Sequence, residues 1–431
     1  MTGLRLLLLA WLLLFAVRHD STASSTYIEV TAAGNRQLRL AVVPPQPIGT
    51  TIRPALANES AAVHSFDLTM SGLVAAEVKD AAPLLNGLAL TPIDFVPWLS
   101  AGYDLLIRGE YELRGEELTL EFRLYDVPAK KMLTSKRFLG REKDLRRFAH
   151  SFSDEIMRAL TGEKGPFTSK ILYVSTKTGS KELFLMDWDG YNPQQLTNNR
   201  SITISPDISP DAKEIIFTSY KRGNPDLYKR GLVGTVEVPI SSRRGLNITG
   251  SWSPDGSKIA LALSKDGNTE IYTIARDGSA PNRLTVTQAA NVSPAWSPDG
   301  SKIAFVSDRF GKPQLFTMDA KGGNVQRFGY GGAYTVNPAW SPKGDKLAYA
   351  KSAGGFQIFV ANADGSNEQQ LTFDGNNERP RWSPDGRLIV FSSKRGGPEA
   401  LYVMRADGSG QTKISRSGGL SQHPVWVPQN P

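Results

Sequence analysis

One sequence unit recurs six times in the C-terminal part of this 431-residue chain, at almost constant spacing. Two copies are degenerate: Ile208-Ser209-Pro210-Asp211 lacks the Trp, and Trp426-Val427-Pro428 lacks the Ser and the Gly. The other four copies contain the turn Trp-Ser-Pro-x-Gly, at Trp252–Gly256, Trp296–Gly300, Trp340–Gly344 and Trp382–Gly386. Positions 208, 252, 296, 340, 382 and 426 lie 44, 44, 44, 42 and 44 residues apart. A period of about 40–45 residues built from short strands is typical of a β-propeller blade, so the sequence predicts six blades.

The order of strands within the repeat predicts how the ring of blades closes. An apolar run follows each Trp turn, as at Ile259–Leu261, and a second strand with a branched-then-aromatic pair follows it, as at Ile271-Tyr272. Lys170–Ser175 resembles the strand after a Trp turn, but no Trp turn precedes it, and Trp426 begins a unit with no strands after it. The C-terminal strand is therefore predicted to complete the first blade, which leaves only short, protected edges. Each Trp is expected to pack between blades with its indole N–H toward a backbone carbonyl.

The preceding residues show no repeat and predict a small N-terminal α/β domain at 24–161, a linker at 162–169 and the propeller at 170–431. The predicted fold class is mainly β, with an α+β N-terminal domain. Apolar spacing predicts a strand at 38–43, a helix at 57–78, a hairpin at 105–125 and a helix from 145 that ends at Thr161-Gly162.

Composition predicts export from the cytoplasm. Residues 1–23 have Arg5, the apolar run Leu6–Val17 and small residues up to Ala23, as in a cleaved signal peptide, and the run is too short for a stable membrane span. The chain has no Cys, which excludes disulfides and thiolate chemistry. The formal net charge of +8 is spread along the chain without a Lys/Arg run, so nucleic acid is not an expected partner.

The order of these parts resembles a known family. Leu124-Tyr125-Asp126 in the small domain, the junction Leu160-Thr161-Gly162-Glu163, and Ile171–Ser175 opening a Trp-Ser-Pro-Asp-Gly propeller are similar to the TolB family of the periplasmic Tol–Pal system. The resemblance implies a non-enzymatic periplasmic scaffold that binds the peptidoglycan-associated lipoprotein, Pal, at the propeller mouth. It also implies contact with TolA through the N-terminal segment, with other outer-membrane lipoproteins as further candidate partners. The implied role is outer-membrane integrity and invagination of that membrane in cell division.

The matching N-terminal segment is about Ser24–Thr31, with Tyr27, Ile28, Glu29 and Val30 at its centre. Such an exposed strand can add itself to the edge of a partner's sheet. The alternative is that it forms the first strand of its own domain. A segment that docks in one state and is released in another would be a switch.

The loops that enter the innermost strands are the expected partner-binding mouth, because function in propellers usually lies in loops at one end of the channel. They combine amide, hydroxyl and charged side chains, which suits recognition of a protein or peptide. The alternative for each residue alone is strand capping. The candidate residues are Thr203, Asn247, Thr249, Asn291, Ser293, Thr335, Asn337, Asn377, Glu378, Arg379, Gln422 and His423.

Two other classes of function remain as alternatives: a propeller enzyme that acts on peptides or sugars, and a propeller that binds metal ions or peptides for another purpose. A peptidase would need a Gly-x-Ser-x-Gly elbow, which the sequence lacks, and a sugar-active propeller would need acids converging on the channel, where only Glu378 is placed. No cofactor and no metal site are predicted. A channel Ca²⁺ stays a hypothesis because Asp residues recur in the repeats, although most belong to Pro-Asp-Gly turns, where Asp bonds locally.

Overall fold

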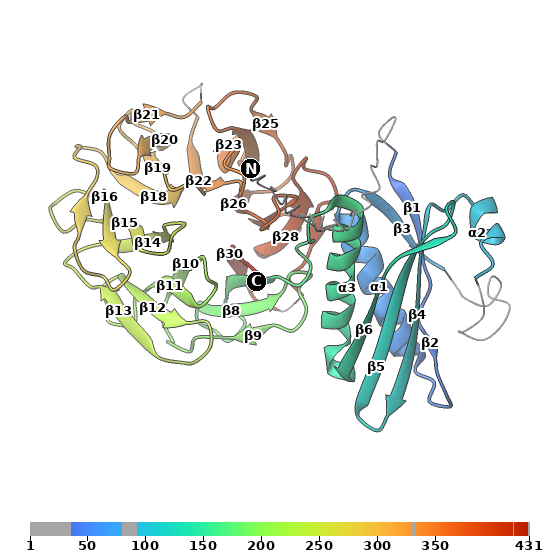
Figure 1. Ribbon diagram of the computed structural model, residues 1–431. Helices are drawn as coiled ribbons and strands as arrows, with labels where there is room; N and C mark the ends of the chain where they lie inside the picture. Colours follow the sequence, from blue (N-terminus) through green and yellow to red (C-terminus); the bar gives the residue numbers. More distant parts are fainter. Residues whose placement is uncertain (1–35, 80–92, 330–332, 417, 430–431) are drawn as a thin grey trace, which may run out of the picture.

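The computed structural model describes residues 36–79, 93–329, 333–416 and 418–429. It has two parts: a sheet covered by helices, and a ring of six four-stranded sheets (Figure 1). The chain is therefore mainly β, with a small α/β domain before a six-bladed propeller, as predicted. The predicted signal peptide and the candidate segment Tyr27–Val30 lie outside the described residues.

The N-terminal domain is one sheet with strand order β3-β1-β4-β5-β6, and β2 pairs with β4. Its strands are β1 Leu38–Val42, β2 Gln46–Pro47, β3 Val74–Val78, β4 Leu105–Arg114, β5 Glu117–Asp126 and β6 Lys131–Arg141. Helices α1 (Pro54–Met70) and α3 (Leu145–Thr161) pack together and share one core with one face of the sheet. Short helix α2 (Val96–Ser100) inserts the fully buried Trp98 against the other face. No helix in the described part of the chain is long and apolar enough to cross a membrane.

The first predicted helix was wrong at its C-terminal end. The sequence predicted 57–78, but α1 ends at Met70, and Gly72 adopts φ +77. Val74–Val78 then forms β3, which runs parallel to β1, so Leu73 and Val74 follow apolar spacing for a different reason. The second predicted helix is confirmed: α3 ends at Thr161, and Gly162 has the left-handed φ of +80 that commonly terminates helices.

The propeller consists of six antiparallel sheets that run from the channel outward. The innermost strands are β30 Ser421–Val427, β10 Thr203–Ile208, β14 Asn247–Trp252, β18 Asn291–Trp296, β22 Thr335–Trp340 and β26 Asn377–Trp382. The second strands are β7 Lys170–Ser175, β11 Glu214–Ser219, β15 Lys258–Leu263, β19 Lys302–Ser307, β23 Lys346–Ser352 and β27 Leu388–Ser393. The third strands are β8 Glu182–Asp187, β12 Asp226–Gly231, β16 Glu270–Ala275, β20 Gln314–Asp319, β24 Phe356–Asn362 and β28 Ala400–Arg405. The outermost strands are β9 Gln194–Gln195, β13 Glu237–Ser241, β17 Asn282–Arg283, β21 Gln326–Arg327, β25 Gln369–Gln370 and β29 Thr412–Lys413.

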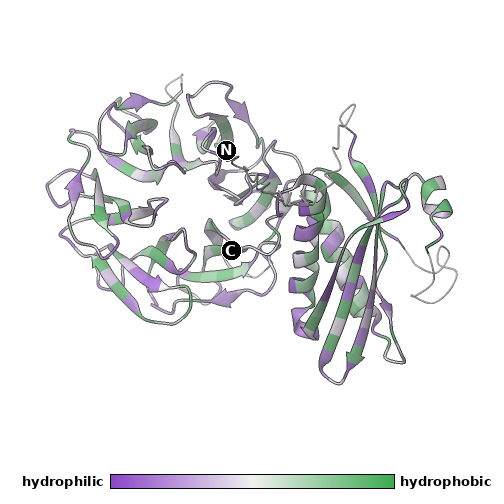
Figure 2. Ribbon diagram, viewed as in Figure 1, coloured by the Kyte–Doolittle hydropathy of each residue, from purple (hydrophilic) through white to green (hydrophobic). Residues whose placement is uncertain are grey.

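Strand β30 is the innermost strand of the first blade, where it pairs with β7 through Trp426↔Ile171 and Val425↔Leu172. The last strand of the chain thus joins the first blade to the sixth. Second and third strands are almost continuously buried because neighbouring blades cover both faces, and Figure 2 shows hydrophobic residues along the strands.

The Trp side chains pack between blades, with differing partners for the indole N–H. Trp340 Nε1 donates to Ala295 O at 3.2 Å and Trp382 Nε1 to Ala339 O at 3.1 Å, each a carbonyl of the preceding blade, as predicted. Trp426 Nε1 instead donates to the Ser169 hydroxyl at 2.5 Å. Trp252 Nε1 and Trp296 Nε1 are buried without a hydrogen-bond partner among the described residues, so the predicted bond to a carbonyl was wrong at these three positions.

The two domains share a continuous apolar core. Trp188, which follows β8 in the first blade, is fully buried and stacks on Phe66 of α1 with ring centroids 5.0 Å apart. It also contacts Phe167 of the linker and Trp426 of β30. Because one aromatic side chain joins helix, linker and propeller, the packing fixes the small domain against the ring.

A buried ionic network borders this core. His150 of α3 places Nδ1 2.9 Å from an Asp67 oxygen and Nε2 3.4 Å from Asp189 Oδ2, and Arg146 also pairs with Asp189. Burial opposes the imidazolium, but Asp67 and Asp189 outweigh it and raise the pKa of His150 to about 10. His150 is therefore a charged interdomain contact at neutral pH.

Candidate functional site

The strand order places two sets of loops at one end of the channel. Innermost strands begin at this end, so the connections between blades and the connections between second and third strands lie there as well. We call this end the entry face. The Ser-Pro-x-Gly turns and the Asp-Gly turns lie at the opposite end, which we call the turn face.

A repeated backbone feature lines the channel below the entry face. The third residue of each innermost strand has positive φ, between +51 and +59, and each strand has a register shift at that point. Such bulges re-aim side chains, and a left-handed non-Gly residue is strained. The six residues are Ser205, Thr249, Ser293, Asn337, Arg379 and His423. All six line one cavity of about 50 Å³, and we call them the channel ring.

Neighbouring members of the channel ring are bonded to one another. The Ser205 N–H donates to His423 Nδ1 at 3.0 Å, and the Ser293 N–H donates to Thr249 Oγ1 at 3.3 Å. Asn337 Oδ1 is buried without a hydrogen-bond partner among the described residues. The ring is thus partly joined by its own hydrogen bonds, with polar capacity left for a ligand.

His423 is a neutral member of the ring. Burial lowers its pKa well below the ordinary value, and the positive charges of Arg379, Lys181 and Arg381 lower it further. Because Nδ1 accepts the Ser205 N–H, the neutral ring carries its proton on Nε2. His423 is therefore a hydrogen-bond donor at neutral pH, without a charge of its own.

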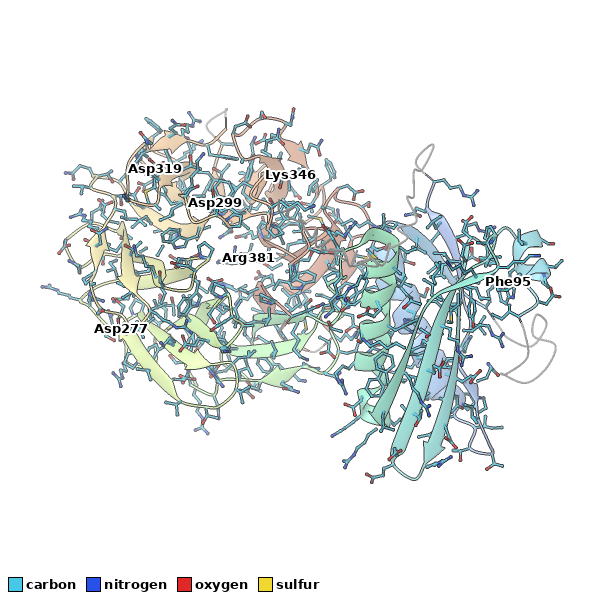
Figure 3. The ribbon with its side chains drawn as sticks, in the orientation of Figure 1. Phe95, Asp277, Asp299, Asp319, Lys346 and Arg381 are labelled. Carbon is cyan, nitrogen blue, oxygen red and sulfur yellow. The ribbon has the colours of Figure 1, made fainter. Side chains whose placement is uncertain are left out.

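Two arginines give the cavity its charge. Arg379 and Arg381 both line it, and Figure 3 labels Arg381 at the centre of the ring of blades. Arg381 Nη1 lies 3.4 Å from Pro380 O and 3.5 Å from Pro338 O, which are weak contacts. Arg379 makes no hydrogen bond or ion pair with any other residue that the structure describes. Burial lowers the pKa of both guanidiniums, but Arg stays charged in proteins.

Asp207 supplies an opposing charge to Arg381. Its Oδ2 accepts a hydrogen bond from the backbone N–H of Trp252 at 2.8 Å. Burial raises the pKa of Asp207 to about 6, although Arg381 acts against this shift. Asp207 is therefore mostly ionised at neutral pH and balances one of the two guanidiniums.

The structure divides the predicted mouth residues into two groups. Five belong to the channel ring: Thr249, Ser293, Asn337, Arg379 and His423. Among the others, Thr203, Asn247, Asn291 and Asn377 are fully buried, Gln422 is nearly so, and Thr335 and Glu378 are half-buried.

The buried residues of the second group hold the blades together. Asn291 Nδ2 donates to Glu270 Oε2 at 2.7 Å, joining the fourth blade to the third. Asn377 Nδ2 donates in the same way to Gln357 Oε1 at 2.8 Å, while Asn247 bonds the loop before it. Their bonding is the strand-capping alternative of the sequence analysis, and in this conformation they present no surface to a partner.

Sequence reasoning missed Ser205 and Arg381, and it considered Asp207 only among the recurring Asp residues of the channel Ca²⁺ hypothesis. Ser205 lies 44 residues before Thr249, so it occupies the same position in the repeat. Applying the period to every candidate position would have found it. Arg381 and Asp207 lie on the strands rather than in the loops, so a search confined to loops could not find them.

The recurring Asp residues of the repeats bond within their own turns. Asp255 Oδ1 accepts the Ser253 hydroxyl at 2.5 Å and the Ser257 N–H at 3.0 Å, and these bonds lower its pKa to about 2. Asp299 repeats the arrangement in the next blade. The part of the chain that the structure describes contains no group of three or more His, Asp or Glu side chains arranged to hold a metal ion.

Large apolar side chains are exposed in the loops of the entry face. These are Ile202, Val286, Phe310, Tyr334 and Phe373, with exposed fractions from 41% to 78%. Exposed apolar side chains around a polar centre, together with arginine, are typical of a protein interaction surface.

These features define a two-domain protein whose six-bladed propeller presents a polar, arginine-containing channel mouth. Residues 26–133 match the family model described as "TolB amino-terminal domain", and residues 157–430 match "TolB beta propeller domain". The chain belongs to the TolB family of Tol–Pal system proteins.

Relatives that match nearly the whole chain support this family assignment. The chain is 62% identical over 407 residues to the Tol-Pal system protein TolB of Geobacter sulfurreducens, covering 94% of each chain. It is 60% identical over 425 residues to that of Geobacter metallireducens, covering 99% of each. The crystal structure of TolB from Acinetobacter baumannii superposes with a TM-score of 0.78 at 26% identity, covering 91% of this chain and 97% of that one.

Proposed function

We propose that this protein is a non-enzymatic scaffold of the Tol–Pal machine in the periplasm, exported by a cleaved signal peptide. Its propeller mouth binds Pal, and residues 24–31 bind TolA, with other outer-membrane lipoproteins as further partners. The assembly maintains outer-membrane integrity and supports invagination of that membrane in cell division. The supporting observation is the entry face, where exposed apolar side chains surround the channel ring.

Calorimetric titration of residues 24–431 with the soluble Pal domain of the same organism tests this proposal. We expect saturable 1:1 binding that Arg379→Ala and His423→Ala weaken. Lys343→Ala, in a turn-face loop, is the matched control and should bind as the parent protein does. Absence of binding at high micromolar concentration would remove the basis for the Pal assignment.

The two partner sites are proposed to be coupled, so that Pal in the mouth changes the availability of residues 24–31. Thermodynamic linkage requires the effect to be reciprocal. Affinity for a TolA domain measured with and without saturating Pal tests this, and equal affinities would exclude coupling.

A further inference from the structure

Arg379 is a half-buried cation for which the described residues supply no hydrogen-bond or ion-pair partner. The carboxylate that precedes it, Glu378, accepts from Asn376 Nδ2 at 2.9 Å instead. The cavity beside it is also lined by the hydroxyl side chains of Ser205, Thr249 and Ser293. No Arg379 nitrogen is among the fully buried side-chain atoms that lack a partner in the described part of the chain, so the guanidinium stays open to the cavity and can donate to a ligand that accepts hydrogen bonds.

Charge on the two faces of the propeller differs in sign. The acidic residues in the entry-face connections are Asp266, Asp308, Asp374 and Glu399. The basic residues of the same connections are Lys177, Lys181, Arg200, Lys221, Arg222, Arg243, Arg244, Lys265, Arg309, Lys312, Lys394, Arg395 and Arg416. The entry face is therefore strongly basic.

The turn face has the opposite balance. Its basic residues are Lys213, Arg276, Lys321, Lys343 and Arg387. Its acidic residues are Asp189, Asp211, Asp255, Asp277, Asp299, Asp345, Asp364, Glu368, Asp385 and Asp407. A protein with this polarity presents its basic end to an acidic partner and accelerates that encounter, since complementary charge steers association.

We propose that the channel ring contains a carboxylate-binding subsite, in which an acidic side chain of the protein partner enters the cavity and is bound by Arg379 and Arg381. This inference rests on the proposed function, because it names the chemistry that the partner presents to the mouth. The planar guanidinium fork matches a planar carboxylate through two parallel hydrogen bonds. Asp207 opposes one of the two positive charges, so a single negative charge neutralises the remainder.

The size of the cavity favours one small anionic group over a polymer of phosphates. Its volume is about 50 Å³, whereas a single water needs about 10–15 Å³ measured in the same way. A carboxylate fits such a space, while the backbone of a nucleic acid would have to remain outside. The exposed Phe310 and Phe373 of the surrounding loops also suit a protein surface.

The first test uses malonate as the probe and residues 24–431 as the protein. Calorimetry at constant ionic strength should give a dissociation constant of about 1–10 mM, in the range of weak single-contact ligands. Arg379→Gln should weaken malonate binding about tenfold or more, the effect of losing one charged pair. The control is Arg244→Gln, an exposed arginine of an entry-face loop, which should change the constant less than about twofold.

Two further arms identify the anion and guard against a folding defect. Arg379→Lys keeps the charge but loses the fork, and it should still bind malonate more weakly than the parent. Sulfate at equal ionic strength should bind less tightly than malonate. Tighter sulfate binding would overturn the assignment to carboxylate, and unchanged malonate binding in both Arg379 variants would overturn the site.

The second test separates this inference from the proposed function. Malonate should compete with the Pal domain, and Arg379→Gln should lower Pal affinity about tenfold. If Pal binds but neither malonate nor Arg379→Gln affects it, the subsite is wrong and the scaffold function stands. If malonate binds at Arg379 but Pal does not bind, the Pal assignment fails, and so does the acidic side chain of that partner as the occupant.

Discussion

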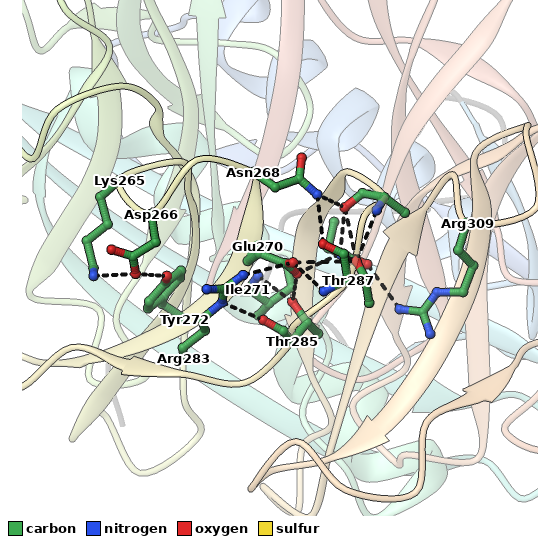
Figure 4. A network of polar contacts seen from close by, with 12 residues as sticks. Lys265, Asp266, Asn268, Glu270, Ile271, Tyr272, Arg283, Thr285, Thr287 and Arg309 are labelled. Carbon is green, nitrogen blue, oxygen red and sulfur yellow. Dashed lines mark hydrogen bonds and ion pairs between the residues drawn. The ribbon is translucent and has the colours of Figure 1, made fainter.

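Replacing Glu270 by Ala is expected to destabilise the propeller, because this buried carboxylate is the acceptor for four donors (Figure 4). Glu270 is fully buried and accepts from Thr285 Oγ1 at 2.5 Å, Thr287 N at 2.6 Å, Asn291 Nδ2 at 2.7 Å and Arg283 Nη2 at 3.1 Å. These bonds join the third and fourth strands of the third blade and the first strand of the fourth.

The magnitude follows from which donors lose every acceptor. Asn291 Nδ2 keeps Thr287 Oγ1 at 2.8 Å and Ala289 O at 3.1 Å, so it stays satisfied in Glu270→Ala. The Thr285 hydroxyl and the Thr287 N–H have no other acceptor among the residues that the structure describes and lose their hydrogen bond in this variant. An unsatisfied buried donor costs about 1–3 kcal/mol. Thr285 is buried, whereas Thr287 is half-buried and its N–H can turn to water, so the free energy of unfolding should fall by about 1–3 kcal/mol.

The fifth blade offers a matched comparison, because Gln357 occupies the equivalent place. Gln357 Oε1 accepts from Thr372 and Asn377, while its Nε2 donates to Gly375 O at 2.9 Å. Glu270→Gln would turn an amide NH₂ toward donors, and Gln357→Glu would turn a carboxylate oxygen toward a carbonyl. Each exchange should cost about 1–3 kcal/mol although it changes almost no volume.

Urea unfolding followed by far-ultraviolet circular dichroism at pH 7 measures all three variants. An unchanged dependence of the unfolding free energy on urea concentration would show that the comparison is valid. A Glu270→Ala variant within about 0.5 kcal/mol of the parent, the usual range of surface substitutions, would refute the hydrogen-bond accounting. If Glu270→Gln and Gln357→Glu leave the free energy of unfolding unchanged, the role assigned to donor–acceptor polarity is refuted.

Three further predictions concern the domain interface and the contacts between blades. The pKa of His150 is raised to about 10 in the folded protein. Its stabilising contribution is therefore complete below the unfolded pKa of about 6.5 and is lost as pH rises toward 10. The urea midpoint should fall over this pH window, and His150→Gln should flatten that decline. Trp188→Ala should cost about 3–5 kcal/mol by emptying the shared core, measured by urea unfolding, and a cost below about 1 kcal/mol would contradict that packing. Gly190→Ala should lower the thermal midpoint more than Gly267→Ala. Both glycines have positive φ (+88 and +105), but a Cβ at Gly190 would lie 1.7 Å from Ile414 O, whereas a Cβ at Gly267 would meet nothing within 4 Å. Equal losses in the two variants would show that backbone strain alone is responsible.

The repeat made the propeller predictable, because its spacing specifies both the number of blades and the position of each turn. The N-terminal domain has no such redundancy. Leu73 and Val74 fit the spacing of the helix before them, and only the left-handed Gly72 and the parallel pairing with β1 show that a strand has begun. Apolar spacing alone does not distinguish the two cases when a helix and a buried strand adjoin.

At the channel, the sequence identified the correct loops but could not rank the residues within them. Asn291 and Ser293 stand two residues apart, yet one is fully buried in the Glu270 cluster and the other lines the cavity. The bulge in the strand separates their roles by reversing the sign of φ at Ser293. That reversal depends on pairing with β19 and leaves no mark in the local composition.

The pairing of β30 with β7 has a consequence for the order of folding. Trp426 and Ile171 are partners, but all the other blades are synthesised between them, so the first blade stays without its innermost strand until the end of synthesis. Closing a loop of this length is slow relative to forming each local hairpin. Stalled or clipped chains without residues 421–427 would therefore expose an unpaired strand edge, which is a recognisable mark for periplasmic chaperones and proteases.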